Sequence, residues 1–470
     1  MTSTRSRCST RAGKADVELC SAARVRERLR VGELTSVELT ESLLRRIKET
    51  EPLVHAYAHV CAESAMRSAL AADERRAAGE DLPLLGIPLA IKDNIETVDA
   101  PTEVGSRVMR GHRPLRDANV VERLRAAGAV ILGKTVTHEF AYGLNTPPTR
   151  NPWDLDRFPG ASSAGSAVAV AVGSAFGALG TDTAGSVRTP AAVNGIVGFK
   201  PTYGRISRAG VFPASPSLDH VGMLARTVED CTLLFEAICD PGPSRPAADT
   251  TVDLRGVRLG VERPYFFDYP EVQDGIRDAA EQAIEVLSSL GAEVVEVSVP
   301  ELGFASAAGS IINLVENSAW HQRLLHTHYC DYEPETRRML SLGSLIPAAA
   351  YVNAQKARRV IVDALHRTYR EHGLTALVGP TIPTVAHVLT DPPLSPTPRL
   401  SPLVHHNYPA NLAGLPALSV PCGFSDDLPV GLHITGRPFG DDNVMRVGLA
   451  YQRATRWSAC SPPLDVGEVS

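Results

Sequence analysis

The chain has 470 residues, and its 47 Lys and Arg against 53 Asp and Glu give a formal net charge of −6. This charge offers no basic face for nucleic acid, and a composition of 44% hydrophobic and 21% charged residues excludes a disordered polyelectrolyte. The longest apolar stretch, 167–180, is shorter than the about 20 residues that a membrane-spanning helix needs. We therefore expect a cytoplasmic globular protein with neither nucleic acid nor a membrane as its partner.

The chain is expected to form one large domain. Residues 1–14 are rich in Arg and Ser and lack the apolar segment of a secretory signal, so they are predicted to be a disordered leader. The single domain is expected to cover 15–465. It divides into a helical N-terminal part at 15–78, a core at 79–235 that holds the motifs discussed below, and a remainder at 236–465 with further strands and helices.

The first clear element is a helix in the N-terminal part. Leu39, Leu43 and Ile47 recur at helical spacing. Ser36 is the predicted N-cap, and Pro52 is expected just after the end of the helix.

Beyond residue 80, short apolar runs alternate with helical patterns. The run LLGIPLAIKDNI at 84–95 predicts a buried strand, and 116–134 predicts a helix followed by a strand. A Gly/Ser-rich loop then leads into an Ala/Val-rich helix that ends near residue 176, and the strand ALGTD follows. Further strands are expected at VRLGVER, AEVVEVSVP, ALVGPTIP, ALSVPCG and GLHITGRP. This alternation predicts an α/β fold with a single large mixed, mostly parallel β-sheet covered by helices on both faces.

Sequence patterns for a nucleotide site, a metal site or an α/β-hydrolase nucleophile are absent or stand in the wrong context. Residues 128–135 match the phosphate-loop pattern, but a helix precedes the first Gly and the four central residues form the apolar strand itself. No G-x-S-x-G elbow occurs. His138 lacks a second His four residues on, and the pair His405 and His406 has no partner motif. No metal and no cofactor is therefore expected.

Two serine clusters are the strongest chemical signal. The sequences PGASSAGS at 159–166 and LGTDTAGSVRTP at 179–190 flank the small-residue helix and the strand after it. A helix of about 11 residues and a strand of about five span similar lengths, so both clusters are expected at one edge of the sheet. That edge is the carboxyl end of a strand, where open α/β folds bind ligands, and the amides of Thr183 to Ser186 could converge there on an anion.

Each residue also has an ordinary structural interpretation. Ser162 or Ser163 could cap the small-residue helix, Ser186 could cap the next helix, and Lys92 could be a solvated lysine at a strand end. However, only six of the 47 basic residues are lysines. A retained lysine is notable because lysine can lose its proton in a protein and arginine cannot.

Taken together, the motifs resemble the amidase signature family of Ser–cisSer–Lys hydrolases. The resemblance covers nearly the whole chain and is carried by LLGIPLAIKDNI, AGAVILGKT, NPWDLDRFPGASSAGSA, LGTDTAGSVRTPAAVNGIVGFKPTYGRISRAG, SLDHVGMLARTVED, NYPANLAGLPALSVPCG and LPVGLHITGRPF. It implies the amidase signature fold and hydrolysis of a C–N bond through an acyl-enzyme, with 79–235 as the catalytic core.

The resemblance also assigns roles to individual residues. It implies that Ser186 is the nucleophile, that Ser162 follows a cis peptide bond, and that Lys92 is the base; the interval of 24 residues between the two serines is the one that the family uses. The implied oxyanion hole consists of the amides of Thr183, Ala184, Gly185 and Ser186, and the implied supporting residues are Ser163, Asp182 and Arg188.

The chain departs from the usual family pattern at three small residues. Ala161 and Ala164 stand where the family usually has Gly, and Ala184 stands where Gly is commoner, a variant that resembles the allophanate-hydrolase branch. A positive φ at Ala184 would strain the loop, because only glycine adopts that conformation without cost.

Three functions follow from the resemblance, and a fourth is opposed by it. The first is an amidase that hydrolyses a small carboxamide or related acyl-nitrogen compound, alone or as a homodimer. The second is the glutaminase component of a tRNA-dependent amidotransferase, its A chain; that branch holds the glutamine amino group with an Asp where this chain has Val404. The third is an allophanate-hydrolase-like enzyme, although the further C-terminal domain common in that branch is not expected here. A catalytically dead binding protein is disfavoured by the intact Lys92, Ser162 and Ser186. The acyl pocket is expected around 142–145, 304–370 and 380–408.

Overall fold

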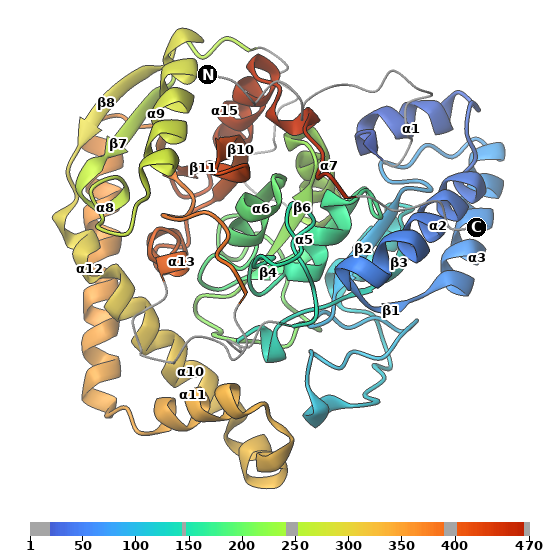
Figure 1. The fold of residues 1–470 in the computed structure, drawn as a ribbon, viewed down its shortest axis with the longest axis horizontal. Coiled ribbons are helices and arrows are strands. Elements are labelled where there is room, and N and C mark those ends of the chain that lie inside the picture. Colours follow the sequence, from blue (N-terminus) through green and yellow to red (C-terminus); the bar gives the residue numbers. More distant parts are fainter. Residues whose placement is uncertain (1–18, 143–146, 241–251, 390–401, 465–470) are drawn as a thin grey trace.

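A computed structural model describes residues 19–142, 147–240, 252–389 and 402–464, so the expected leader at 1–14 lies outside the described residues. Eleven strands of the described segments form one sheet, in the order β1-β3-β2-β4-β6-β5-β10-β11-β9-β7-β8 (Figure 1). The strands are β1 (Tyr57–Val60), β2 (Pro88–Lys92), β3 (Val130–Thr135), β4 (Gly177–Asp182), β5 (Val197–Lys200), β6 (His220–Ala225), β7 (Arg258–Glu262), β8 (Glu293–Val297), β9 (Ala376–Pro380), β10 (Ala417–Ser425) and β11 (Leu428–Gly436).

The expected mixed α/β sheet is confirmed, but fewer neighbouring strands are parallel than the sequence predicts. Strands β3, β2 and β4 run parallel, as do β9, β7 and β8 at the other end. Every neighbouring pair from β4 through β6, β5, β10 and β11 to β9 is antiparallel, and β1 is antiparallel to β3. One reason is local: Asp426 and Asp427 both have positive φ, +50° and +62°, and close a tight hairpin between β10 and β11.

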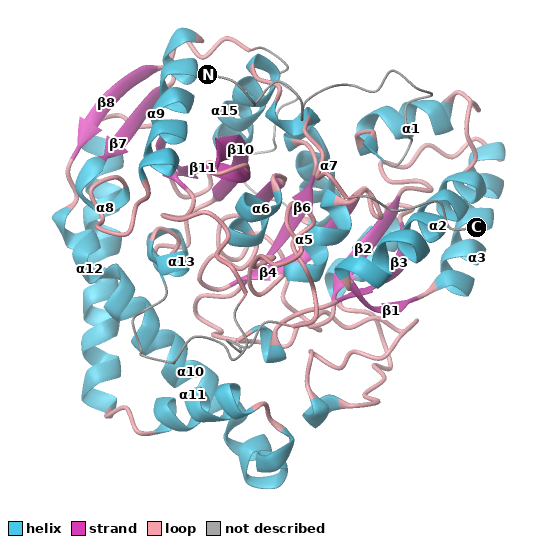
Figure 2. Cartoon of the chain, in the orientation of Figure 1, coloured by secondary structure: helices cyan, strands magenta, loops and turns pink. Residues whose placement is uncertain are grey.

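Fifteen α-helices occur in the described segments and cover the sheet (Figure 2). They are α1 (Ala22–Arg30), α2 (Ser36–Val54), α3 (Ala62–Ala77), α4 (Asn119–Ala126), α5 (Ala164–Ala171), α6 (Arg188–Asn194), α7 (Val228–Ile238), α8 (Arg263–Phe266), α9 (Asp274–Ser289), α10 (Ala305–His328), α11 (Pro334–Ser344), α12 (Ala348–Glu371), α13 (Pro402–His405), α14 (Tyr408–Leu412) and α15 (Asp441–Ala454). Every residue of β2, β3, β4, β5 and β6 is buried, so both faces of this part of the sheet are covered. None of the helices in these segments is long and apolar enough to cross a membrane.

The start and end of α2 differ from the sequence prediction. Thr35, not Ser36, is the N-cap: its hydroxyl accepts a hydrogen bond from the Glu38 amide at 3.1 Å, and the Glu38 carboxylate accepts one from the Thr35 amide at 2.9 Å. This reciprocal capping box satisfies two amides at once, which a single serine cap does not. Pro52 lies inside the last turn of the helix, not after its end.

The fold brings the motif residues to one edge of the sheet. Strands β2 and β4 are parallel neighbours, with Ile91 opposite Leu179, so their carboxyl ends lie side by side. Helix α5 packs on both strands and begins at that same edge. Helix α10 packs against both α11 and α12 away from the centre of the sheet, at the lower left of Figure 1.

Candidate active site

Lys92 is the last residue of β2, and its side chain is completely buried. Its Nζ lies 2.8 Å from Ser162 Oγ and 2.8 Å from Thr181 Oγ1. The lysine therefore joins a loop residue to a residue of the neighbouring strand β4. The expected proximity of Lys92 and Ser162 is present, whereas Thr181 has no assigned role in the sequence prediction.

Ser162 lies in the loop that leads into α5. The peptide bond between Ala161 and Ser162 is cis, as the resemblance implies. The Ser162 carbonyl accepts a hydrogen bond from Thr137 Oγ1 at 3.1 Å and one from the His138 amide at 3.4 Å. These contacts attach the loop to the segment that follows β3.

Ser163 connects the same loop to β4 and to the loop that holds Ser186. Its Oγ donates to the Thr181 carbonyl at 3.2 Å and accepts from the Thr181 amide at 3.3 Å, and its own amide donates to the Ser186 carbonyl at 3.2 Å. It precedes α5, but its side chain does not cap that helix. The interpretation of Ser163 as a helix cap is therefore wrong.

Ser186 lies in the turn between β4 and α6 and is partly exposed, unlike the buried Lys92 and Ser162. Helix α6 begins at Arg188 and its N-cap is Val187, so Ser186 does not cap it. Ser186 is thus partly open to solvent, whereas Lys92 and Ser162 are shielded from bulk water.

The amides before Ser186 differ in their hydrogen bonding. The Gly185 amide donates to Asp182 Oδ1 at 2.9 Å, so it is engaged within the loop. Within the described residues, the amides of Thr183, Ala184 and Ser186 donate to no protein acceptor. These three N–H groups therefore have no acceptor among the described residues.

The left-handed residue of this loop is Gly185, with φ +106°, and not Ala184. A Cβ at Gly185 would lie 2.6 Å from Asn407 Cγ, so the position requires glycine on two grounds. Ala184 has no positive φ. Its methyl group therefore imposes no left-handed strain on the loop.

Asp182 and Arg188 form a fully buried ion pair below the loop, 2.9 Å apart at their closest atoms. The Asn411 amide nitrogen donates to Asp182 Oδ1 at 2.9 Å, and its oxygen accepts from Arg188 at 2.5 Å. Burial raises the pKa of the Asp182 carboxyl, but the adjoining Arg188 guanidinium outweighs it and holds that pKa far below its usual range. The carboxylate is thus charged at all ordinary pH values.

The electrostatic environment favours a neutral Lys92. Burial lowers its pKa to about 7, although the carboxylates of Asp182 and Asp219 act in the opposite direction. His138 is also completely buried, and burial together with the nearby Lys92 lowers its pKa to about 3, so it carries no charge. An amine that is neutral near pH 7 has the free electron pair that a general base needs.

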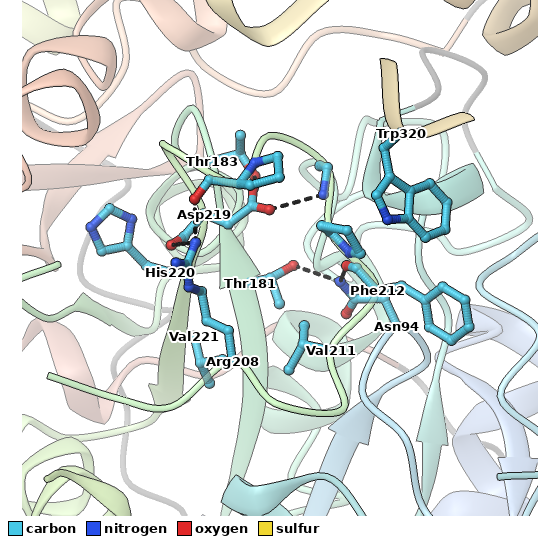
Figure 3. Close-up of a pocket in the computed structure, with 13 residues that line it drawn as sticks. Asn94, Thr181, Thr183, Arg208, Val211, Phe212, Asp219, His220, Val221 and Trp320 are labelled. Carbon is cyan, nitrogen blue, oxygen red and sulfur yellow. Dashed lines mark hydrogen bonds between the residues drawn. The ribbon is translucent and has the colours of Figure 1, made fainter. Parts of the chain in front are cut away.

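A cavity of about 380 Å³ opens beside this cluster (Figure 3). Asn94 and Thr181 line it at one side, and Asn94 Nδ2 donates to Thr181 Oγ1 at 3.1 Å. Thr183 also lines it, and its hydroxyl donates to Asp219 at 2.6 Å. Trp320 of α10 reaches the cavity from the expected pocket region 304–370. Of the expected region 142–145, residues 143–145 lie outside the described residues.

The sequence prediction missed four polar residues around the site: Asn94, Thr181, Asp219 and Asn411. Asn94 lies in the turn two residues after Lys92, the last residue of β2, and Thr181 lies in β4 two residues before Thr183. Closeness in sequence to predicted site residues is a local signal. That signal was available for Asn94 and Thr181. Asn411 comes from a segment more than 200 residues away, for which no local pattern gives a position.

Two further lysines are buried near the site but have other partners. Lys134 Nζ lies 3.1 Å from Asp93 and donates to Thr102 Oγ1 at 2.6 Å. Lys200 Nζ donates to the carbonyls of Pro201 and Leu415. In the segments described, no group of three or more His, Cys, Asp or Glu side chains is arranged to hold a metal ion.

Comparison with known proteins identifies the family. The family model named Amidase matches residues 38–445. The chain is 43% identical over 482 residues to the A chain of the glutamyl-tRNA(Gln) amidotransferase from Roseiflexus castenholzii, covering 94% of this chain and 97% of that protein.

Solved structures with the same fold include two different kinds of enzyme. The A chain of the glutamyl-tRNA(Gln) amidotransferase from Thermotoga maritima is 32% identical, with a TM-score of 0.79 over 96% of this chain and 98% of that one. The native peptide amidase of Stenotrophomonas maltophilia is also 32% identical, with a TM-score of 0.80 over 95% of this chain and 98% of that one. Fold and site thus define an amide hydrolase, an enzyme that acts on C–N bonds. The chain belongs to the amidase signature family.

Proposed function

We propose that the protein hydrolyses a carboxamide through a relay from Ser186 to Ser162 to Lys92. The observation that carries this proposal is the contact of 2.8 Å between Ser162 Oγ and the completely buried Nζ of Lys92. A buried amine in contact with a hydroxyl, in a site with a partly exposed serine and three amides that lack protein acceptors, supports nucleophilic catalysis.

In the proposed reaction, neutral Lys92 takes the proton of Ser162 while Ser162 takes the proton of Ser186. Ser186 Oγ bonds to the carbonyl carbon, and the oxyanion that forms is bound by the amides of Thr183, Ala184 and Ser186. Collapse of this intermediate breaks the C–N bond, and the relay returns the proton to the leaving nitrogen. Water then attacks the acyl-enzyme by the same route, which releases the acid and restores Ser186.

The relatives support the role of an amidotransferase glutaminase component better than the role of a free-standing amidase. The similarity to the Roseiflexus protein extends over 97% of that protein, so it is not confined to the catalytic motifs. In this role the substrate is the side-chain amide of glutamine, and the ammonia passes to other chains of the complex that act on a charged tRNA. Such partners conflict with the expectation, based on net charge, that nucleic acid has no part in the function.

One residue favours the second candidate, a free-standing amidase for another small amide. Val404 occupies the position at which the amidotransferase branch has an Asp for the amino group of glutamine. It is partly buried and packs against the main hydrophobic core. An apolar side chain offers the amino group no hydrogen-bond acceptor, so it disfavours free glutamine.

The experiment that tests both roles measures ammonia or acid release by the purified chain with glutamine, primary amides, anilides, hydrazides and ureas. The amidotransferase role predicts release from glutamine that increases when the other chains of the cognate complex are added. The free-standing role predicts rapid release from another amide without any added chain. Failure to release product from any amide, with or without the added chains, would contradict the hydrolase proposal itself.

A further inference from the structure

The contacts around Lys92 leave one property of the base unexplained, namely the direction of its lone pair. A neutral primary amine carries two N–H groups and one lone pair. Nζ has two hydroxyl neighbours at 2.8 Å, Ser162 Oγ and Thr181 Oγ1, and either could donate its proton to that lone pair. The relay works only if Ser162 is the donor and Thr181 is the acceptor.

Asn94 fixes the orientation of Thr181. Its Nδ2 donates to Thr181 Oγ1 at 3.1 Å and to the Phe212 carbonyl at 3.4 Å. A carbonyl can only accept, so the NH₂ end of the amide must be the end that faces Phe212 and Thr181. The backbone of Asn94 is held as well, because its carbonyl accepts a hydrogen bond from the Phe212 amide at 2.9 Å. Thr181 Oγ1 is therefore held in place by a donor on a fixed segment.

The hydroxyl of Thr181 then has one lone pair left and one proton. Within the described residues, no acceptor other than Lys92 Nζ is recorded for the proton of Thr181 Oγ1, and Thr181 lines the cavity beside the site (Figure 3). The proton can point into that cavity, toward solvent. The second lone pair then faces Lys92, so both acceptor positions of Thr181 are filled by nitrogen donors.

This arrangement suits the charged form of Lys92 without any rearrangement. When Lys92 takes the proton of Ser162 it becomes an ammonium, which has three donors and no acceptor. A Thr181 that already accepts from the amine continues to accept from the ammonium. Polar groups that are oriented before the reaction stabilise developing charge without a cost of reorganisation.

We infer that Thr181, held by Asn94, is a positioning residue for the base: its Oγ1 accepts an N–H of Lys92 and turns the nitrogen lone pair toward Ser162. This inference rests on the proposed relay and adds to it the two residues that orient the base. The titratable groups that face Lys92 are Asp182 and Asp219, which favour its charged form, and the neutral His138.

The test compares Thr181→Val with Thr181→Ser and Asn94→Leu. Valine has the shape of threonine without the hydroxyl, whereas serine retains it. The readout is the second-order rate at which a fluorophosphonate probe labels Ser186, followed from about pH 5 to about pH 10 so that the base titrates within the range. This reagent reports activation of the serine without knowledge of the substrate. Circular dichroism and thermal unfolding show that each variant is folded.

We expect Thr181→Val to lower the rate at high pH by on the order of 10², and Thr181→Ser to restore most of it. We expect the rising part of the profile to move to lower pH in Thr181→Val, because loss of an acceptor disfavours the ammonium more than the amine. Asn94→Leu should lower the high-pH rate by a smaller factor. A merely structural defect that admits water would move the profile to higher pH instead.

Thr102→Val is the matched control. Thr102 Oγ1 also accepts a hydrogen bond from a buried lysine of a parallel strand, Lys134 of β3, which has no part in the proposed relay. In Thr102→Val, the pH profile of Ser186 labelling should keep the midpoint of the wild type.

The inference is overturned if Thr181→Val labels as fast as the wild type, if its profile moves to higher pH, or if Thr181→Ser does not recover. Lys92→Met separates this failure from failure of the relay. If the rising limb persists in Lys92→Met, then the proposed base is wrong. If the rising limb disappears in Lys92→Met but is unchanged in Thr181→Val, only the role of Thr181 is wrong.

Discussion

Asp182 Oδ1 accepts a hydrogen bond of 2.9 Å from the Gly185 amide, and the same carboxylate forms the buried ion pair with Arg188. One side chain thereby shapes the loop before Ser186 and connects it to the start of α6. Arg188 in turn donates to the Asn407 carbonyl and to Asn411, so the loop is attached to the segment before β10. The geometry of the loop at Ser186 therefore depends on a charge pair that is itself fully buried.

Replacing Asp182 by Asn should destabilise the protein strongly. The change leaves the Arg188 guanidinium buried with its hydrogen-bond acceptors reduced and its charge uncompensated. Breaking a buried pair in this way typically costs about 3–5 kcal/mol. Urea unfolding, monitored by tryptophan fluorescence, measures the change in the free energy of unfolding.

The control for Asp182→Asn is Asp253→Asn, which removes an ion pair with Arg255 that is largely exposed to solvent. Exposed pairs contribute little, so this variant should unfold at the wild-type urea concentration. Equal stability of the two variants would show that the Asp182 pair does not hold the loop.

Gly185→Ala should inactivate the enzyme while leaving it folded. The new Cβ would lie 2.6 Å from Asn407 Cγ, and the residue would keep a φ of +106° that alanine disfavours. The loop must then shift, and the amides of Ala184 and Ser186 shift with it. Loss of one oxyanion donor alone typically lowers kcat by about 10² to 10³.

Gly204→Ala separates backbone strain from the steric clash. Gly204 also has a positive φ, +81°, but a Cβ there meets nothing within 4 Å. The Gly204→Ala variant should lose some stability and keep the kcat of the wild type. Similar losses of kcat in the two variants would mean that the contact with Asn407 is unimportant.

The sequence predicts the parts of this site that follow from local patterns. Lys92 at a strand end, and Ser162 and Ser186 on either side of a helix and strand, are placed by alternation and element length. The partners that hold them are different, because Asn407 and Asn411 approach the loop from a segment more than 200 residues away. Contacts of this kind depend on which strands become neighbours in the middle of the sheet. The sequence analysis also predicted a mostly parallel sheet, whereas these middle strands are antiparallel.

Ser186→Ala should abolish turnover, with a loss on the order of 10⁶ if it behaves like the removal of other serine nucleophiles. The partly exposed position of Ser186, beside amides without protein acceptors, is the reason for the expectation. Mass spectrometry of the wild type after treatment with a fluorophosphonate should find the label on Ser186. A label on Ser162 would mean that the roles of the two serines are reversed.

The pH dependence of activity should report the proton of Lys92. Burial lowers the pKa of this amine to about 7, and the amine must be neutral to take a proton from Ser162. Below that pH it is an ammonium and cannot act as a base, so kcat/KM should rise with pH through about 7 and level off above it.

Lys92→Arg keeps a positive charge but cannot supply a free amine, because the guanidinium keeps its proton at any accessible pH. We therefore expect Lys92→Arg to be nearly as inactive as Lys92→Ala, and we expect the rising limb to be absent from both. The three profiles, measured with one chromogenic anilide or with the best amide from the substrate panel, decide the role of the lysine. Substantial activity in Lys92→Arg would reduce Lys92 to a fixed charge and end its assignment as the general base.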